Sequence, residues 1–188
     1  MGRLKKFTDE QLWDMTQMLL LDVGYQAFTM SLLAEKLGVS RAALYKKYQN
    51  KEELLVQFML IKMEESVQLL TTIEENLSFH EQLDVLLRKL NKMKDLHSIL
   101  GIAEKIDDVN DCVVAKKEKL ASMHGDLIIP LQRVIALGKE EGVIHPDKND
   151  FLILSFIFQV VDIPNYAQLE EEQFIQAIKD LLLNGMTQ

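Results

Sequence analysis

The chain has 188 residues, a formal net charge of -8 and 48% hydrophobic residues, which is enough for one large domain or two small domains with a packed core. One cysteine excludes an internal disulfide and a cysteine-based zinc site. Only three prolines and eight glycines interrupt the chain, and this composition favours helices over many short strands. The sequence therefore predicts an all-α fold, with about nine helices.

The charge is unevenly distributed along the chain. Residues 1–52 carry a net charge of +2, whereas residues 53–188 carry -10. Nucleic-acid binding depends on a local patch of positive charge rather than on the total charge. We therefore expect two domains, a DNA-facing domain over 1–52 and an acidic domain over 53–188. The basic arm at residues 2–6 could reach a groove or phosphates, or could act as a solubilising tail.

The N-terminal region is expected to hold three short helices and the start of a long one. The pattern from Thr8 to Gln11 is a capping box and opens the first helix, which ends at Gly24. Helices over 29–37 and 41–48 follow, joined through Gly38, and so short a connection makes them cross as a helix-turn-helix. The fourth helix begins at Lys51 and extends to about residue 75, so it is about 25 residues long.

Apolar spacing predicts five further helices. They are expected from Ser78 past Met93, from Asp107 or Asp108 to Met123, from beyond Pro130 to Glu141, over 149–162, and from about Glu170 to Gly185. Gly125 and Pro130 are expected to break or kink the path between the second and third of these. Residues 149–162 are apolar nearly all round, which predicts burial on several sides.

The second helix of the helix-turn-helix has the charge of a DNA-reading helix. No acidic residue occurs from Leu37 through Lys51, as a helix between walls of phosphate requires. Arg41 can donate two hydrogen bonds to guanine O6 and N7. Lys51 lies in the first helical turn, where free backbone N–H groups also attract phosphate.

About residues 8–58 resemble the tetracycline-repressor-like (TetR) family of bacterial regulators. The matching residues, in the family's order and spacing, are Gly24-Tyr25, Thr29-Met30-Ser31, Leu33-Ala34, Gly38-Val39-Ser40, Leu44-Tyr45 and Asn50-Lys51-Glu52-Glu53-Leu54. Two positions depart from the usual pattern: Ala42 stands where Gly or Pro is frequent, and Tyr48 stands where Phe is usual.

The resemblance implies a homodimer, with a DNA-binding head, a helical body that binds an effector, and an interface of the last two helices at about 149–163 and 170–185. It implies DNA contacts at Thr29, Ser31, Ser40, Arg41, Ala42, Ala43, Tyr45, Lys46, Lys47 and Lys51. Capping is an alternative role for Thr29 and Ser31, and core packing is an alternative role for Tyr45.

Apolar residues of the body are candidates for the effector pocket, since methionines adapt to irregular ligands. They are Met59, Met63, Phe79, Leu83, Leu87, Leu90, Met93, Met123, Leu127 and Phe158. Plain core packing is the alternative role for each of them.

The expected function is a sequence-specific transcriptional regulator on double-stranded operator DNA, a repressor that a small-molecule effector releases. The alternatives are an all-helical protein-interaction module and an activator without an effector. Neither a nucleophile elbow, a Walker loop nor a dinucleotide fingerprint occurs in the sequence, so we expect no enzyme, no cofactor and no metal. The lack of a signal peptide or membrane span predicts a cytoplasmic protein.

Overall fold

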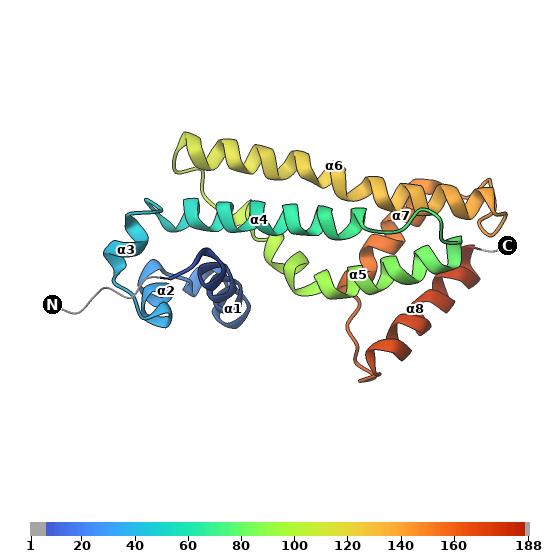
Figure 1. Ribbon diagram of the computed structural model, residues 1–188, viewed down its shortest axis with the longest axis horizontal. Helices are drawn as coiled ribbons and strands as arrows, with labels where there is room; N and C mark the ends of the chain where they lie inside the picture. The colour runs from blue at the N-terminus through green and yellow to red at the C-terminus, as the bar shows by residue number, and fades with distance from the viewer. Residues whose placement is uncertain (1–6, 187–188) are drawn as a thin grey trace. The chain divides into compact units, whose positions relative to one another are not determined.

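The structure is a computed structural model that describes residues 7–186, and the basic arm at residues 2–6 lies outside this range. The described residues form α-helices and two short 3-10 helices, without strands (Figure 1). The elements are α1 (Asp9–Ala27), α2 (Met30–Leu37), α3 (Arg41–Tyr45), α4 (Lys51–Thr71), α5 (Phe79–Leu100), η1 (Ala103–Lys105), α6 (Asp111–Glu140), α7 (Asp150–Gln159), η2 (Val160–Asp162) and α8 (Glu171–Met186). The predicted all-α class is confirmed.

The described residues contain eight α-helices rather than nine, because α6 is a single helix of 30 residues where two were predicted. Pro130 lies inside α6 and removes one hydrogen-bond donor from the helix. Leu127, Leu131 and Val134 are nonetheless at most 2% exposed. Their spacing of four and three residues keeps one apolar face buried across the proline, and this burial offsets the missing hydrogen bond.

The chain folds into two compact units. The first contains residues 1–63 and 95–121, and the second contains residues 64–94 and 122–188. Three helices, α4, α5 and α6, contribute residues to both units. The functional division into 1–52 and 53–188 stays a prediction.

The first unit is built around the buried faces of α1 to α4. The ring of Trp13 lies 5.9 Å from that of Tyr48 and 6.1 Å from that of Phe58, between ring centroids. Tyr48 is 7% exposed, and the chain turns after α3 to bring it inward. The prediction that this helix continues to Tyr48 is therefore wrong; it ends at Tyr45.

The predicted caps of the first unit are present. The Gln11 N–H donates to Thr8 Oγ1 at 3.1 Å, and the Thr8 N–H donates to Gln11 Oε1 at 3.0 Å. Gly24 has a φ of 72° and interrupts α1, although helical residues resume as far as Ala27. A left-handed backbone of this kind favours glycine because it has no side chain to strain.

In the second unit, the end of α4 is fixed by a side chain of α5. Lys89 Nζ donates to the Leu69 carbonyl at 2.7 Å and to Thr72 Oγ1 at 2.6 Å. A cation at the Leu69 carbonyl satisfies one of the groups that the helix leaves open and opposes the negative end of its dipole. The helix consequently ends at Thr71, four residues before the predicted end.

A second set of charges joins α5 to α8. Arg88 donates to both carboxylate oxygens of Glu172 at 2.6 and 2.7 Å, and its Nε donates to Asp84 at 2.8 Å. Lys179 Nζ lies 3.5 Å from the other Asp84 oxygen. These guanidinium and ammonium groups hold the pKa of the Asp84 carboxyl below its usual value, against the opposing effect of burial. The network therefore depends on both carboxylates being ionised.

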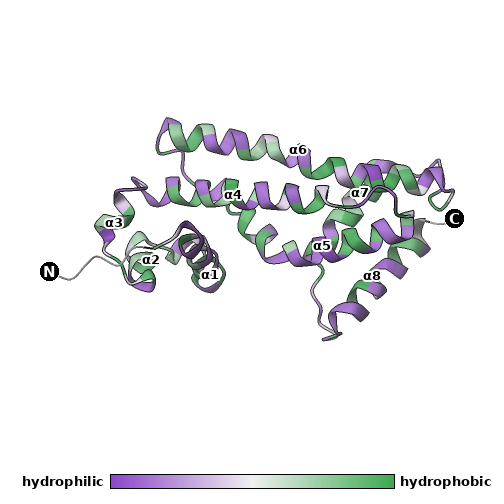
Figure 2. Cartoon of the chain, in the orientation of Figure 1, coloured by the Kyte–Doolittle hydropathy of each residue, from purple (hydrophilic) through white to green (hydrophobic). Residues whose placement is uncertain are grey.

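Figure 2 shows α7 as almost continuously hydrophobic, whereas α8 alternates between hydrophobic and hydrophilic residues. In α7, Ile153, Leu154 and Ile157 are buried. The opposite side is open: Phe151 is 72% exposed and Phe156 is 68% exposed. The single chain therefore buries one side of α7, and the burial of its other sides stays a prediction. Within residues 7–186, no helix is both long and apolar enough to span a bilayer.

Candidate nucleic-acid interface

The turn between α2 and α3 has the geometry of a helix-turn-helix. Gly38, with a φ of 67°, ends α2, and the N–H of Val39 donates to the Ala34 carbonyl at 2.9 Å. Ser40 Oγ then accepts from the Ala43 N–H at 3.3 Å and caps α3. Leu44 is fully buried, so the turn holds α3 with one face inward and the other face open.

The open face of α3 combines positive charge with small side chains. Arg41, Ala42, Lys46 and Lys47 are exposed, and Ala43 is partly exposed. Alanine methyl groups let the helix backbone approach base edges closely and can contact a thymine methyl group. Long basic side chains at the two ends of the helix can meanwhile reach guanine or phosphate.

Arg41 and Tyr45 lie together on α3. The guanidinium carbon of Arg41 is 5.9 Å from the centroid of the Tyr45 ring, and the tyrosine is 42% exposed. The ring attracts the guanidinium without neutralising it. The core-packing role considered for Tyr45 does not fit this exposure.

Lys47 forms an ion pair with Asp9 at the start of α1. This pair could not be predicted from the sequence, because 38 positions separate the partners. Both side chains are substantially exposed, so solvent screens their attraction. A phosphate group can therefore compete with Asp9 for the ammonium.

A hollow of about 410 Å³ brings together Thr29, Tyr45 and Lys51 from three elements of the first unit. Thr29 Oγ1 accepts from the Leu32 N–H at 3.1 Å, so Thr29 caps α2 as well as lining this hollow. Its other lining residues are Gln26, Phe28, Met30, Gln49, Asn50 and Glu52. Ser31 is exposed on α2 but does not line the hollow.

The start of α4 is fixed by its own hydrogen bonds. The Glu53 N–H donates to Asn50 Oδ1 at 2.7 Å, and the Gln49 N–H donates to Glu53 Oε2 at 3.0 Å. Lys51 is the first residue of α4 and lines the hollow together with Gln49 and Asn50. An anion in the hollow would thus meet a helix N-terminus and a lysine at once.

Tyr48 lies behind this surface and stays protonated at neutral pH. Burial raises the pKa of its hydroxyl to about 12, and the negative charges of Asp9 and Glu53 act in the same direction. The residue therefore contributes packing and a neutral hydroxyl, not a charge.

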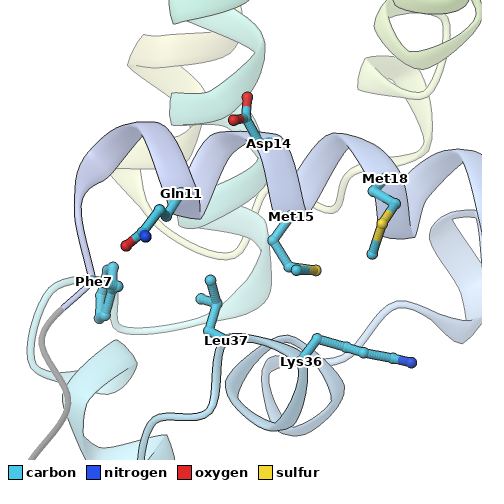
Figure 3. A pocket seen from close by; sticks show the side chains of 7 residues that line it. All are labelled: Phe7, Gln11, Asp14, Met15, Met18, Lys36 and Leu37. Carbon is cyan, nitrogen blue, oxygen red and sulfur yellow. The ribbon is translucent and has the colours of Figure 1, made fainter.

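A second hollow, of about 390 Å³, lies between α1 and α2 and includes none of the predicted DNA contacts. Figure 3 shows Gln11 and Met15 of α1 facing Leu37, with Asp14 directed away from it. The remaining lining residues are Phe7, Met18 and Lys36. Met18 is 48% exposed, so this is a surface feature and not an internal cavity.

The residues predicted to line an effector pocket are distributed over both units. Met59 and Met63 belong to the first unit and are fully buried. The others belong to the second unit, where each is at most 9% exposed apart from the partly exposed Phe158. Phe79 lies against Gly138, next to which Ile144 also lies, as a core residue does. No group of three or more potential metal ligands occurs among residues 7–186.

The fold and this surface define a helix-turn-helix DNA-binding protein. Residues 13–58 match the family described as bacterial regulatory proteins of the tetR family. This match confirms the resemblance to the tetR family seen in the sequence of about residues 8–58.

One similar protein is the uncharacterized HTH-type transcriptional regulator YhgD of Bacillus subtilis (strain 168). It is 26% identical to this chain over 125 residues, which are 65% of this chain and 64% of that protein. The match therefore spans slightly less than two thirds of the relative.

Solved structures share the fold over nearly the whole chain. A regulatory protein of the tetR family from Rhodococcus RHA1 has a TM-score of 0.78 and 15% identity, with 96% of this chain and 98% of the other covered. The regulator AibR, solved in complex with isovaleryl coenzyme A and operator DNA, has a TM-score of 0.73 and 17% identity, with 93% of this chain and 97% of the other covered.

Proposed function

We propose that this regulator is a homodimeric repressor that binds operator DNA through α3 and the hollow at the start of α4, and that a small-molecule effector releases it. The observation that carries the proposal is the exposed, acid-free face of α3, held by the buried Leu44 and the turn at Gly38. An exposed basic helix fixed in this way fits the major groove, whose walls are phosphate.

The proposed contact residues fall into two roles. Arg41, Ala42 and Ala43 lie in the first turn of α3 and are proposed to read base edges. The backbone phosphates are proposed to be held by Thr29, Ser31, Ser40, Tyr45, Lys46, Lys47 and Lys51. Phosphate contacts set the register of the protein on DNA, and base contacts give sequence preference.

Arg41→Ala should lower the affinity for the operator by about 1–3 kcal/mol and relax the preference at one base pair. The operator would first be obtained by selection from genomic DNA, and the affinity would then be measured by gel shift at several salt concentrations. Lys92→Ala removes a similarly exposed positive charge from α5 and serves as the control, with unchanged operator affinity. Equal weakening by Arg41→Ala on every DNA sequence would contradict the base-reading role.

The dimer is proposed to form through the apolar sides of α7 and α8. Phe151, Leu152, Phe156 and Leu181 are between 60% and 75% exposed. A groove of about 250 Å³ runs between the two helices and includes Leu152, Phe156 and Leu181. A second copy presenting the same surface would cover these side chains symmetrically.

The effector is proposed to bind among the buried apolar side chains of the second unit, where Phe79, Leu83, Leu87 and Leu90 are at most 1% exposed. Release requires that the effector bind a DNA-incompetent conformation more tightly than the DNA-competent one. Because this coupling is reciprocal, operator DNA must weaken effector binding by the same factor. Isovaleryl coenzyme A, which AibR binds, is a suitable first probe in a ligand panel.

An activator without a small-molecule effector is the second candidate function. The high burial of the predicted pocket residues favours the absence of an effector, since a filled core leaves less space for a ligand. Operator affinity that no compound changes, together with increased transcription from the bound promoter, would support this alternative over the repressor.

A further inference from the structure

Tyr25 makes two contacts with Lys51. The lysine Nζ lies 4.1 Å from the centroid of the Tyr25 ring, and it donates to the Tyr25 carbonyl at 3.4 Å. Tyr25 directly follows Gly24, whose φ of 72° turns the backbone at this point. The break in α1 therefore places both the ring and the carbonyl of one residue against the same ammonium.

The Tyr25 hydroxyl lies close to Asp107, in the stretch between η1 and α6. Burial raises the pKa of this hydroxyl, and the negative charges of Glu52 and Asp107 act in the same direction. This stretch is itself anchored, because Lys117 Nζ donates to the Ile106 carbonyl at 2.8 Å and to Asp108 at 2.6 Å. All of these residues belong to the first unit.

We propose that Tyr25 is a positioning residue for DNA binding, which holds the Lys51 ammonium at the start of α4 through its ring and its carbonyl. This inference rests on the proposed function, because it concerns how one of the proposed phosphate contacts is prepared.

The contacts with Tyr25 leave the Lys51 ammonium able to bind an anion. A lysine ammonium has three donors, and Tyr25 engages one of them through its carbonyl. The aromatic face attracts the ammonium but carries no net charge, so the positive charge remains available to an anion. Lys47, by contrast, is paired with the Asp9 carboxylate, which must be displaced.

Restricting the Lys51 side chain in advance favours DNA binding. A free lysine side chain has many rotamers, and fixing it on DNA costs conformational entropy. The two contacts with Tyr25 restrict Lys51 before DNA arrives. Lys51 also lines the hollow that includes Thr29 and Tyr45, two other proposed phosphate contacts.

The experiment is a double-mutant cycle with Tyr25→Leu, Lys51→Ala and the double variant, in the full-length chain. Binding would be measured to a fluorescent 30-base-pair duplex of random sequence at several KCl concentrations, since phosphate contacts do not need the operator. Lys51→Ala and Tyr25→Leu should each weaken binding about three- to tenfold, and Lys51→Ala should lower the salt slope by about 0.9. The double variant should bind no more weakly than Lys51→Ala alone.

Tyr25→Phe is the matched control, because it keeps the ring and the carbonyl and removes only the hydroxyl. It should bind within about twofold of the parent chain, since the cation–π contact remains. If circular dichroism shows that Tyr25→Leu has lost helix, the half-buried site would take Tyr25→Met in the same cycle.

Two results would overturn the proposal: fold-losses that multiply in the double variant, or a Tyr25→Leu variant that binds as the parent does. In either case the parent chain still binds DNA, so the proposed function stands. A parent chain that fails to bind any duplex at low salt would overturn both the proposed function and the positioning role.

Discussion

Phe156→Glu is expected to convert the protein into monomers and to lower its affinity for a two-half-site operator by about 100-fold or more, because a dimer gains its second head's contacts at a high effective concentration. The single chain should tolerate the change, since Phe156 is 68% exposed. In a dimer that covers α7, the same carboxylate would be buried without a partner.

Sedimentation velocity would measure the oligomeric state, and gel shift would measure operator affinity. Ile129→Glu is the matched control, because Ile129 is 53% exposed on α6 and lies outside the proposed interface. It should leave both measurements unchanged. A Phe156→Glu protein that remains dimeric would show that the dimer forms through another surface.

Gly138→Ala is expected to destabilise the protein by up to about 2 kcal/mol, although alanine is the better helix former. A Cβ at this position would lie 2.7 Å from both Phe79 Cε2 and Ile144 Cδ1. Phe79 cannot easily move away, because it is fully buried and its N–H donates to the Glu141 carboxylate at 3.1 and 3.2 Å. Overpacking costs about 1–3 kcal/mol and is only partly offset by the helix propensity of alanine, about 1 kcal/mol.

Gly125→Ala in the same helix is the control and should change the stability in the opposite direction. No atom lies within 4 Å of a Cβ built there, and the position is exposed. The substitution should therefore raise stability by about 0.5–1 kcal/mol. Urea unfolding monitored by circular dichroism would measure both variants. Equal shifts would mean that helix propensity, and not the contact with Phe79, decides the effect at Gly138.

The parts of the fold that could be predicted depend on neighbours in sequence. The capping box at Thr8, the cap at Thr29 and the left-handed Gly38 each involve residues no more than a few positions apart. Their side chains satisfy or end a helix locally, whatever the rest of the chain does. The helix-turn-helix followed from these local signals together with the spacing of buried leucines.

The parts that could not be predicted depend on contacts between distant residues. Pro130 has the local signature of a helix break, yet the buried face formed by Leu127 and Val134 continues α6 through it. The ion pair of Lys47 with Asp9 and the contact of Lys51 with Tyr25 join residues 38 and 26 positions apart. Periodicity likewise identified the apolar residues of the body, but it cannot distinguish a ligand-binding cavity from a filled core.

The charge network between α5 and α8 also bears on the order in which the chain can fold during synthesis. Arg88 and Glu172 are 84 residues apart, so α5 leaves the ribosome long before its partner exists. Until then Arg88 retains only the Asp84 contact, four residues away on the same helix. A nascent chain lacking α8 would leave this side of α5 uncovered until α8 has been translated. Chains truncated before Glu172 should therefore depend on chaperones more than the full-length chain.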